Sequence, residues 1–316
     1  MSLLAKDEIE QQIRQFFKGK ILKQEPLSAH TTIKIGGPAQ IFLEPYEQND
    51  LEKLIKYLNS QNIPFYLIGK GSNLLVTDKI LQAVVISLSS EFFKKIFIKN
   101  NLVFAGAGVA LAEIVEFSRK NSFSGLEFLA GIPGTVGGAT IMNAGCWDVN
   151  LEKTPIKKHL CISGVIEKIE LMDQQGNIYL QKKEELEFGY RMSNLKDKIV
   201  LGCWFKLYSS SQAEIIEKIN KFLKYKKSSQ ELKLPNAGCI FKNPKDYNLS
   251  AGALIEQAAL KGEIIGGAQI SNLHANFIVN NGQAQFLDVI RLMQRIQKKI
   301  KEDYSIDLEP EIQIWE

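Results

Sequence analysis

The sequence is poor in the residues that build metal centres and disulfide frameworks. Its 316 residues include four cysteines and three histidines. No two cysteines have the C-x-x-C spacing of zinc or redox sites, and His30, His159 and His274 lie far apart along the chain. We therefore expect no metal site and no disulfides, and reduced thiols are typical of cytoplasmic proteins.

Long apolar runs and a strong net charge are also missing. No uninterrupted apolar stretch approaches the roughly 18 residues that a membrane span requires. The N-terminal residues become charged and amphipathic at once, unlike a signal peptide. The net charge is +4, and the densest basic runs, 221–227 and 298–301, fall on expected helices and are typical of solvated faces. We expect a cytoplasmic protein that neither enters membranes nor binds nucleic acid, and no obligate protein partner is evident.

The two common nucleotide-binding motifs are absent from the turn GKGSNL. Pro64 and Gly71 stand where a P-loop has glycine and serine or threonine. Leu74 stands where a Rossmann fingerprint has its third glycine or an alanine. The turn is still a candidate anion-binding nest, with main-chain N–H groups and the side chains of Ser72 and Asn73 as donors, and an ordinary loop is the alternative.

The most unusual stretch of the sequence is rich in glycine. Residues Ser124 to Gly145 include six glycines among small and apolar side chains. Glycine lets a ligand approach the main chain closely. Surface loops are usually polar, whereas this segment also carries large apolar residues such as Phe128 and Leu129. We expect a largely buried loop that forms a ligand cradle, and we expect no packed core helix within it.

Hydrophobic periodicity predicts several amphipathic helices. The clearest are 111–120, 212–227 and 284–304. Asn49, with Glu52 three residues on, and Ser250 are expected N-caps of two others. A hairpin is expected around the turn 175–177, and a domain boundary is placed near residue 209, where strand-like segments give way to a helix.

A set of short motifs then follows in order along the chain: IGKGSNLLV, GLEFLAGIPGTVGGATIMNAG, FGYRMS, NAGCIFKNP, HANFIVN and LEPEI. In this order and spacing they resemble the UDP-N-acetylenolpyruvoylglucosamine reductase family of bacterial peptidoglycan precursor synthesis, and the resemblance runs from about Thr31 to Glu311. The short linkers resemble the family's second type, which lacks an extra substrate-covering loop.

The resemblance implies an α+β protein with a two-part FAD-binding domain of the p-cresol methylhydroxylase type and a C-terminal α+β substrate-binding domain. The implied divisions are 1–87 and 88–208 for the two FAD-binding subdomains, 209–300 for the substrate-binding domain and 301–316 for a segment returning to the active site. FAD and NADPH are the implied cofactors. The implied reaction is the reduction of UDP-N-acetylglucosamine enolpyruvate to UDP-N-acetylmuramate.

The resemblance also implies a catalytic set. In the family's reaction a hydride reaches the enolpyruvyl group and an enolate needs stabilisation and then a proton. Arg191, in GYRMS, matches the family's arginine, and a planar guanidinium suits a developing carboxylate enolate. Glu311, in LEPEI, matches the family's glutamate, with Glu309 as the competing choice.

Cys239 is a departure from the family, because many members carry a proton-donating serine at this position. Cysteine has a reference pKa of about 8.5, so its thiol is a competent general acid while it stays protonated. A nearby Arg191 or Lys242 would favour the thiolate and oppose that role. The alternative is a small buried cysteine with no chemical role.

The remaining implied residues bind ligands. Tyr190 and Asn243 are expected to contact the diphosphate or sugar of the substrate, and Lys227 is expected to assist phosphate binding. His274 is expected to be structural. Trp147 is a second departure, because the family more often has Ala-Tyr-Gly after NAG, and it puts the local loop conformation in question. The implied cofactor-binding residues are Gly69, Lys70, Gly71, Ser72, Asn73, Gly131, Ile132, Pro133, Gly134, Thr135, Gly137, Gly138 and Ala139.

Two alternative functions stay open at this point. One is another flavin oxidoreductase of the same fold; several of these attach flavin covalently, for which only Cys146 is suitably placed. The other is a catalytically silent protein that binds a flavin or a sugar nucleotide. The simultaneous presence of Arg191, Cys239 and Glu311 disfavours the silent protein.

Overall fold

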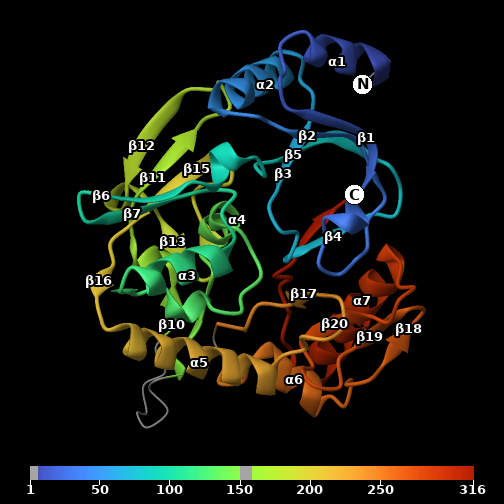
Figure 1. The fold of residues 1–316 in the computed structure, drawn as a ribbon. Helices are drawn as coiled ribbons and strands as arrows, with labels where there is room; N and C mark the ends of the chain where they lie inside the picture. The colour runs from blue at the N-terminus through green and yellow to red at the C-terminus, as the bar shows by residue number, and fades with distance from the viewer. Residues whose placement is uncertain (1–5, 150–158, 246) are drawn as a thin grey trace. The chain divides into compact units, whose positions relative to one another are not determined.

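The computed structural model describes residues 6–149, 159–245 and 247–316, and it divides into two compact units (Figure 1). Each unit is assembled from three separate stretches of chain and has its own hydrophobic core. Unit 1 consists of Met1–Lys23, Gln40–Lys70 and Gln82–Tyr225, and unit 2 of Gln24–Ala39, Gly71–Leu81 and Lys226–Glu316. The predicted four-part division remains a prediction.

The first part of the chain forms a four-stranded sheet in the order β1-β2-β5-β3, in which β3 runs parallel to β5. Helix α2 buries one apolar stripe that includes Leu51, Leu54 and Leu58. The elements of this part are α1 (Lys6–Arg14), β1 (Lys20–Pro26), η1 (Leu27–Ala29), β2 (Pro38–Glu44), α2 (Gln48–Ser60), β3 (Phe65–Ile68), β4 (Leu74–Val76) and β5 (Leu81–Ser87).

The two expected N-caps have different outcomes. Ser250 caps α6 (Ala251–Gln257) as predicted, because its Oγ accepts from the N–H of Ala253 at 3.2 Å. The prediction for Asn49 is wrong: α2 begins at Gln48, with Glu47 at the N-cap, two residues before the predicted cap. The nearby carboxylate of Asp50 instead accepts hydrogen bonds from the main-chain N–H groups of the residues at 18 and 46, so tertiary contacts outweigh the local capping preference.

The middle of the chain forms an antiparallel five-stranded sheet in the order β12-β11-β15-β7-β6. The predicted hairpin turn is confirmed, with Gly176 at φ 78° between β11 and β12. The elements are η2 (Glu91–Lys94), β6 (Ile96–Lys99), β7 (Leu102–Gly106), α3 (Leu111–Lys120), β8 (Phe123–Ser124), η3 (Glu127–Leu129), α4 (Val136–Ile141), β9 (Gly145–Trp147), β10 (His159–Cys161), η5 (Ile162–Gly164), β11 (Ile166–Met172), β12 (Ile178–Lys182), η6 (Lys183–Glu185), β13 (Phe188–Gly189), β14 (Met192–Ser193), β15 (Ile199–Phe205), β16 (Tyr208–Ser209) and α5 (Gln212–Ser229).

The glycine-rich segment 124–145 is buried as predicted, but it is not a continuous loop. Its core helix α4 packs against β7 and β15, so the expectation of no packed helix is wrong. Gly137 explains how a helix fits there: a Cβ at this position would lie 2.9 Å from Cβ of Ala107 on the strand side. Small residues therefore bring the helix close to the sheet instead of keeping the chain irregular.

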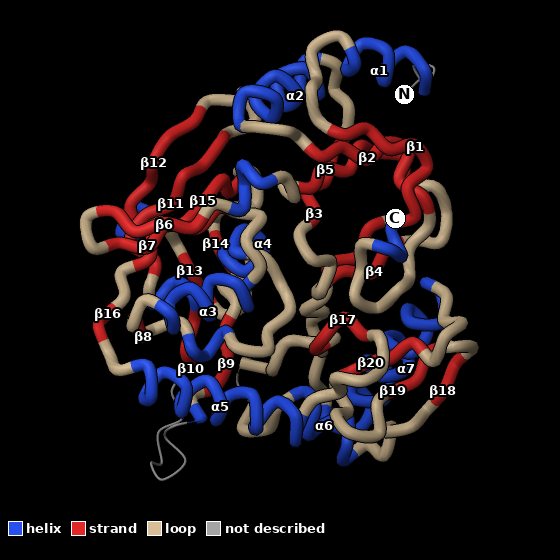
Figure 2. The backbone as a smooth tube through the Cα atoms, viewed as in Figure 1, coloured by secondary structure: helices blue, strands red, loops and turns tan. Residues whose placement is uncertain are grey.

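Unit 2 contains an antiparallel sheet in the order β17-β20-β19-β18 (Figure 2). It also contains a separate parallel pair, β21 with β4. The long helix α7 contacts β18 and β19 and buries Val289, Leu292 and Ile296. The remaining elements are β17 (Asn236–Cys239), α6, β18 (Ile264–Ile265), β19 (Ala268–Ile270), β20 (Phe277–Asn280), α7 (Phe286–Tyr304) and β21 (Gln313–Trp315).

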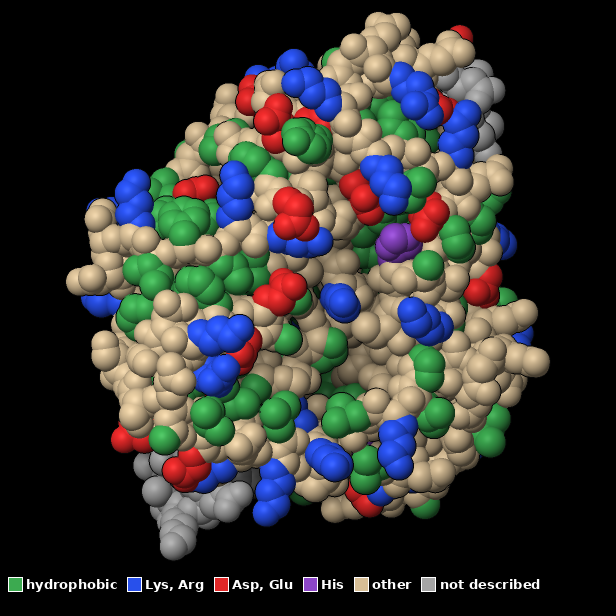
Figure 3. All heavy atoms as spheres, viewed as in Figure 1, with side chains coloured by type: hydrophobic (Ala, Val, Ile, Leu, Met, Phe, Trp, Pro, Cys, Tyr) green, Lys and Arg blue, Asp and Glu red, His purple; other side chains and the backbone are tan. Residues whose placement is uncertain are grey.

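The surface carries both signs of charge. On the face drawn in Figure 3, Lys and Arg side chains are interspersed with Asp and Glu, and pairs such as Lys56 with Glu52 lie within ion-pair distance. Among the helices of the described residues, none combines the length and apolar character that crossing a membrane requires.

Candidate functional site

In unit 1, the first predicted cofactor loop meets the second. A Cβ added to Gly69 would lie 2.5 Å from Oγ1 of Thr135, so the main chain at 69 lies directly against the glycine-rich segment. The next glycine of the turn, Gly71, adopts φ 59° and would bring a Cβ within 2.1 Å of the carbonyl oxygen of His30. Both positions therefore require glycine, one for a close approach and one also for its backbone conformation.

The glycine-rich segment is fixed on one side and open on the other. On the fixed side, the N–H of Leu111 donates to the carbonyl of Gly134 at 3.0 Å, and the N–H of Gly137 donates to the carbonyl of Ala107 at 2.9 Å. On the open side, Gly131 and Gly138 are exposed. A Cβ at Gly138 would meet only Oγ1 of Thr135, at 3.5 Å. A rigid main-chain surface of this kind can receive a flat or phosphorylated ligand at close range.

Tyr190 and Arg191 form the two-residue turn of the hairpin between β13 and β14. Arg191 has φ 54°, a left-handed conformation that costs a residue with a Cβ about 1–2 kcal/mol. Its Nη1 donates to the carbonyl oxygen of Gly145 at 3.1 Å, and its guanidinium carbon lies 5.2 Å from the centre of the Tyr190 ring. A bulky residue held in a strained turn is characteristic of functional sites.

The small sheet of β9 and β10 lies beside this turn. His159 stacks edge-on against Trp147 and against Tyr190, and its Nδ1 lies 2.9 Å from the sulfur of Cys161. Burial and the neighbouring Arg191 charge lower the pKa of His159 to about 4. Burial raises the pKa of the Cys161 thiol. Both side chains are therefore neutral at pH 7.

In unit 2, Cys239 lies at an irregularity of the sheet. The pairing of β17 with β20 shifts register between Asn236 and Cys239, and Gly238 between them adopts φ 76°. The side-chain oxygen of Asn236 accepts from the N–H of Gly238 at 3.0 Å and fixes this bulge. Bulges of this kind change the direction in which a side chain points, and they are frequent next to active sites.

The structure brings Glu311 and Asn73 to the same place. The N–H of Glu311 donates to the carbonyl of Ile240, the residue after Cys239, at 2.7 Å. The amide of Asn73 donates to the carbonyl of Glu311 at 3.0 Å, and the N–H of Gln313 donates to the carbonyl of Asn73 at 2.9 Å. Residues from three distant parts of the sequence thus form one cluster in unit 2.

The structure also distinguishes the two candidate glutamates. Glu309 is largely exposed, and its carboxylate forms an ion pair with Lys242. Glu311 is half-buried and lies on the segment that pairs beside Cys239. The arrangement favours Glu311, and it gives the charge of Lys242 a carboxylate partner.

The other predicted substrate-binding residues are less clearly placed. The side-chain oxygen of Asn243 accepts from the N–H of Ala251 at the start of α6, at 3.0 Å, so part of this amide has a structural task. Lys227 is exposed on α5, whereas the preceding Lys226 is 3% exposed. Burying a charged group so deeply costs free energy unless the group has partners. Lys226 is therefore a candidate functional residue that the sequence pattern did not reveal.

His274 has the contacts of a structural residue, as expected from the sequence. Its Nδ1 accepts from the N–H of Asn276 at 3.2 Å, and its ring packs against Phe277 with centroids 4.6 Å apart. Burial lowers its pKa. Its neighbour Asn276 holds the chain beyond Cys239, because its side chain exchanges two hydrogen bonds with the main chain of Phe241.

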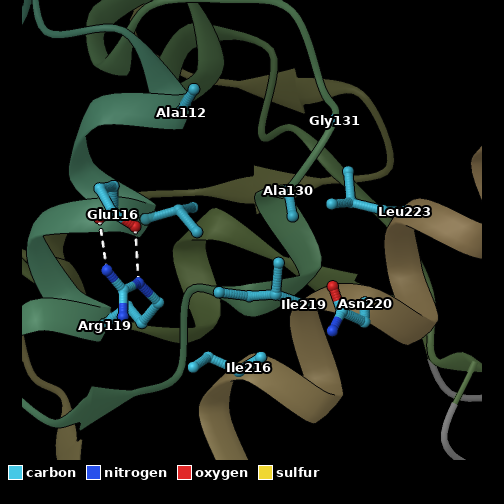
Figure 4. Close-up of a pocket in the computed structure, with 10 residues that line it drawn as sticks. Ala112, Glu116, Arg119, Ala130, Gly131, Ile216, Ile219, Asn220 and Leu223 are labelled. Atoms are coloured by element: carbon cyan, nitrogen blue, oxygen red, sulfur yellow. Dashed lines mark hydrogen bonds and ion pairs between the residues drawn. The ribbon is translucent and has the colours of Figure 1, made fainter. Parts of the chain in front are cut away.

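A pocket of about 390 Å³ lies between α3 and α5 in unit 1. Its walls are mainly apolar, with Ala130, Ile216 and Ile219 among the residues that line it, and the ion pair of Glu116 with Arg119 closes one side (Figure 4). Of the predicted site residues, Gly131 alone is among those that line this pocket. The pocket therefore touches the glycine-rich segment at Gly131 but does not include Thr135 or the other predicted cofactor-binding residues. In the described part of the chain, no cluster of His, Cys, Asp and Glu is arranged to hold a metal ion.

Two family models match the chain. Residues 39–178 match the FAD binding domain, and residues 230–315 match the C-terminal domain of UDP-N-acetylenolpyruvoylglucosamine reductase. Together they confirm the predicted fold class, an FAD-binding part followed by a C-terminal substrate-binding part.

Curated relatives and a crystal structure agree over nearly the whole chain. The UDP-N-acetylenolpyruvoylglucosamine reductase of Caldanaerobacter subterraneus subsp. tengcongensis is 40% identical over 299 residues, 94% of each chain. The enzyme of the same name from Bacillus licheniformis is 39% identical over 98% of each chain. The crystal structure of the Thermus caldophilus reductase superposes with a TM-score of 0.77 at 34% identity, covering 95% of this chain and all of that one.

Proposed function

The chain belongs to the UDP-N-acetylenolpyruvoylglucosamine reductase family, and from this premise we propose that it reduces UDP-N-acetylglucosamine enolpyruvate to UDP-N-acetylmuramate, with NADPH as the reductant and FAD as the hydride carrier. The relatives' shared name and the FAD-binding match support this function. We place the reaction in the cytoplasm, in keeping with the four free cysteines.

The residues of unit 1 fit the diphosphate of FAD. Gly69 lies against Thr135, and Gly138 leaves open space that a side chain would fill, so phosphate oxygens can reach main-chain N–H groups. Gly69, Lys70 and the segment Gly131–Ala139 would hold the cofactor from unit 1, and Gly71, Ser72 and Asn73 follow directly in the chain. When bound, FAD supplies hydride transfer from NADPH to the terminal carbon of the enolpyruvyl group.

Arg191 is the group that stabilises negative charge. Hydride addition leaves charge on the carbon next to the carboxylate and on the carboxylate itself. A guanidinium is permanently charged and planar, and it can donate two parallel hydrogen bonds to a carboxylate. The turn at Tyr190–Arg191 fixes the backbone of this residue, which reduces the reorganisation needed when charge develops.

Cys239 and Glu311 complete the proton transfer. The thiol of Cys239 gives its proton to the carbon next to the carboxylate, which ends the reduction and leaves a thiolate. In this proposal Glu311, whose main-chain N–H donates to the carbonyl of Ile240, returns a proton from solvent to that thiolate. The observation that supports this assignment is the main-chain hydrogen bond between Glu311 and Ile240, the residue after Cys239, which lie 71 positions apart in the sequence.

The test separates the two half-reactions. Under anaerobic conditions NADPH should bleach the flavin absorbance of the purified protein, and UDP-N-acetylglucosamine enolpyruvate should then restore it. Cys239→Ala should leave bleaching unchanged and slow the restoration by roughly 10²–10⁴-fold, the usual contribution of a positioned proton donor. Cys239→Ser, which keeps a proton-donating group, should retain a substantial rate.

Cys146→Ala is the matched control, because Cys146 is a half-buried cysteine of unit 1 whose sulfur donates to the carbonyl of Phe128 at 3.3 Å. This variant should restore flavin absorbance at the wild-type rate, and acid precipitation of the wild-type protein should release the yellow cofactor into solution. Wild-type turnover by Cys239→Ala would remove that residue from the mechanism. A flavin that the enolpyruvyl substrate never reoxidises would overturn the proposed function itself.

A further inference from the structure

Two aromatic residues that the catalytic set does not include are connected to Arg191 by a series of ring contacts. Trp147 and His159 have ring centroids 5.1 Å apart and nearly perpendicular planes, at 86°. The rings of His159 and Tyr190 are in contact in turn, with centroids 5.7 Å apart and planes at 72°. The guanidinium of Arg191 then lies over the Tyr190 ring. Edge-to-face pairs at such distances are favourable arrangements for aromatic rings.

We propose that Trp147 and His159 are positioning residues, which hold the Tyr190 ring and through it the guanidinium of Arg191 in the orientation that receives the substrate carboxylate. This inference rests on the charge-stabilising role proposed above for Arg191. The proposal also gives a role to the Cys146-Trp147 departure from the family pattern, because it explains the bulky Trp147 side chain after NAG.

The scaffold of this stack is one short strand pair. Trp147 on β9 is directly opposite His159 on β10, so their side chains emerge on the same face of the pair. The same strand β9 begins at Gly145, whose carbonyl accepts the hydrogen bond from Arg191. Strand β9 therefore supports Arg191 in two ways. The carbonyl of Gly145, at one end of the strand, accepts the hydrogen bond from Arg191, and Trp147, at the other end, packs against the ring of His159.

The turn itself is fastened next to the stack. The side-chain amide of Asn143 donates to the carbonyl of Gly189 at 2.8 Å, immediately before Tyr190. The strained φ of Arg191 needs surroundings that over-determine it. The amide of Asn143 fixes the main chain, and the rings fix the side chains.

The charges around the stack suit this task. His159 faces Arg191 and Cys161, and its pKa of about 4 keeps the imidazole neutral. The raised pKa of Cys161 keeps its thiol protonated. A charged imidazolium would repel the guanidinium, and a thiolate would attract it away from a substrate carboxylate. With both groups neutral, the rings support Arg191 by packing without competing for its charge.

The experiment is a double-mutant cycle on the reoxidation of reduced flavin by UDP-N-acetylglucosamine enolpyruvate. His159→Ala removes two ring contacts and should slow reoxidation about tenfold, and His159→Phe, which keeps a ring, should stay within about twofold of wild type. Bleaching by NADPH should be unchanged in both variants. In an Arg191→Ala background, His159→Ala should have no further effect, because the group that it positions is gone.

Trp147→Ala should slow reoxidation by a smaller factor, about threefold, since it removes one ring contact. Phe97→Ala is the matched control: Phe97 is 39% exposed, against 44% for Trp147, and it stacks on Phe104 in the same unit. This control should leave reoxidation unchanged. If His159→Ala slows the wild-type and Arg191→Ala proteins by the same factor, the positioning role is refuted while the role of Arg191 stands. If Arg191→Ala alone reoxidises at the wild-type rate, the role proposed for Arg191 fails first.

A second readout needs no turnover. The chain has three histidines, so NMR of histidine-labelled protein can follow each ring, and His159→Phe identifies the signal of His159. Because the Arg191 charge contributes to the low pKa of His159, Arg191→Ala should raise the titration midpoint of that signal. An unchanged midpoint would show that the arginine does not lie against the stack and would overturn the inference.

Discussion

Substitutions at Arg191 can separate the effect of its backbone conformation from the effect of its side-chain charge. At φ 54°, any residue with a Cβ loses about 1–2 kcal/mol relative to the ordinary region, and glycine loses none of this. Arg191→Ala and Arg191→Gly both remove the hydrogen bond to Gly145 and the contact with Tyr190. In the folded state they differ in the strain, which alanine keeps and glycine relieves.

The difference in stability can be worked out. Relief of strain favours the glycine variant by about 1–2 kcal/mol, and the larger conformational freedom of glycine in the unfolded chain takes back roughly 0.5–1 kcal/mol. Arg191→Gly should therefore be more stable than Arg191→Ala by about 1 kcal/mol in urea unfolding. Both should slow flavin reoxidation by the enolpyruvyl substrate by about 10²–10³-fold, the usual loss for one preorganised charge-stabilising donor.

Two measurements on the same preparations decide the matter. Anaerobic stopped-flow gives the rates of bleaching by NADPH and of reoxidation, and urea titration gives the unfolding free energies. Arg191→Lys, which keeps the charge and loses the planar fork, should lie between wild type and alanine in reoxidation rate. Equal stabilities of the glycine and alanine variants would refute the strain at this turn, and rapid reoxidation by the glycine variant would refute the need for a guanidinium.

Two further predictions concern backbone conformation and pH. Gly71 and Gly238 both have positive φ, but a Cβ would lie 2.1 Å from a carbonyl oxygen at Gly71 and, at Gly238, 3.9 Å from the nearest atom beyond its chain neighbours. Gly238→Ala should therefore lower the unfolding free energy by about 1–2 kcal/mol, and Gly71→Ala should lower it clearly more. Equal urea midpoints for the two variants would contradict this reasoning. The lowered pKa of His159, about 4 against 6.5, means that the unfolded chain takes up this proton first as the pH falls. Its contribution to stability is complete above pH 6.5 and is lost between pH 6.5 and 4, so His159→Phe should flatten that part of the curve of unfolding free energy against pH, and a wild-type-like curve would contradict the assignment.

Local signals in the sequence predicted the helices and caps that local interactions determine. Helix 111–120 appears with the expected bounds, and Ser250 caps α6. Asn49 had the same kind of signal and is not a cap, because the carboxylate of Asp50 organises the chain before α2 through contacts with residues distant in sequence. A capping pattern describes a preference of about 1 kcal/mol, which tertiary hydrogen bonds readily exceed.

The candidate site was predictable only as an ordered set of motifs. Nothing in the residues around Cys239 indicates that Glu311 pairs with the main chain beside it, because that pairing depends on the C-terminal segment running between Ile240 and Asn73. The stack behind Arg191 was equally hidden, since the pairing of Trp147 with His159 is a property of a strand pair with no turn signal in the sequence. Glycine content predicted the cradle but gave no sign of the helix α4 inside it.

The two halves of the proposed chemistry differ in how strongly they constrain side-chain identity. The direction of Cys239 is set by its neighbours, through the bulge at Gly238, the amide of Asn236 and the clasp of Asn276 on the following residues. If Cys239 is the proton donor proposed above, another small acid such as serine can occupy this position without rebuilding the site. Arg191 is more constrained, because its guanidinium contacts both the Tyr190 ring and the carbonyl oxygen of Gly145. We therefore expect substitutions at Cys239 to change the rate and pH dependence of one step, and substitutions at Arg191 to change both the unfolding free energy and the rate of that step.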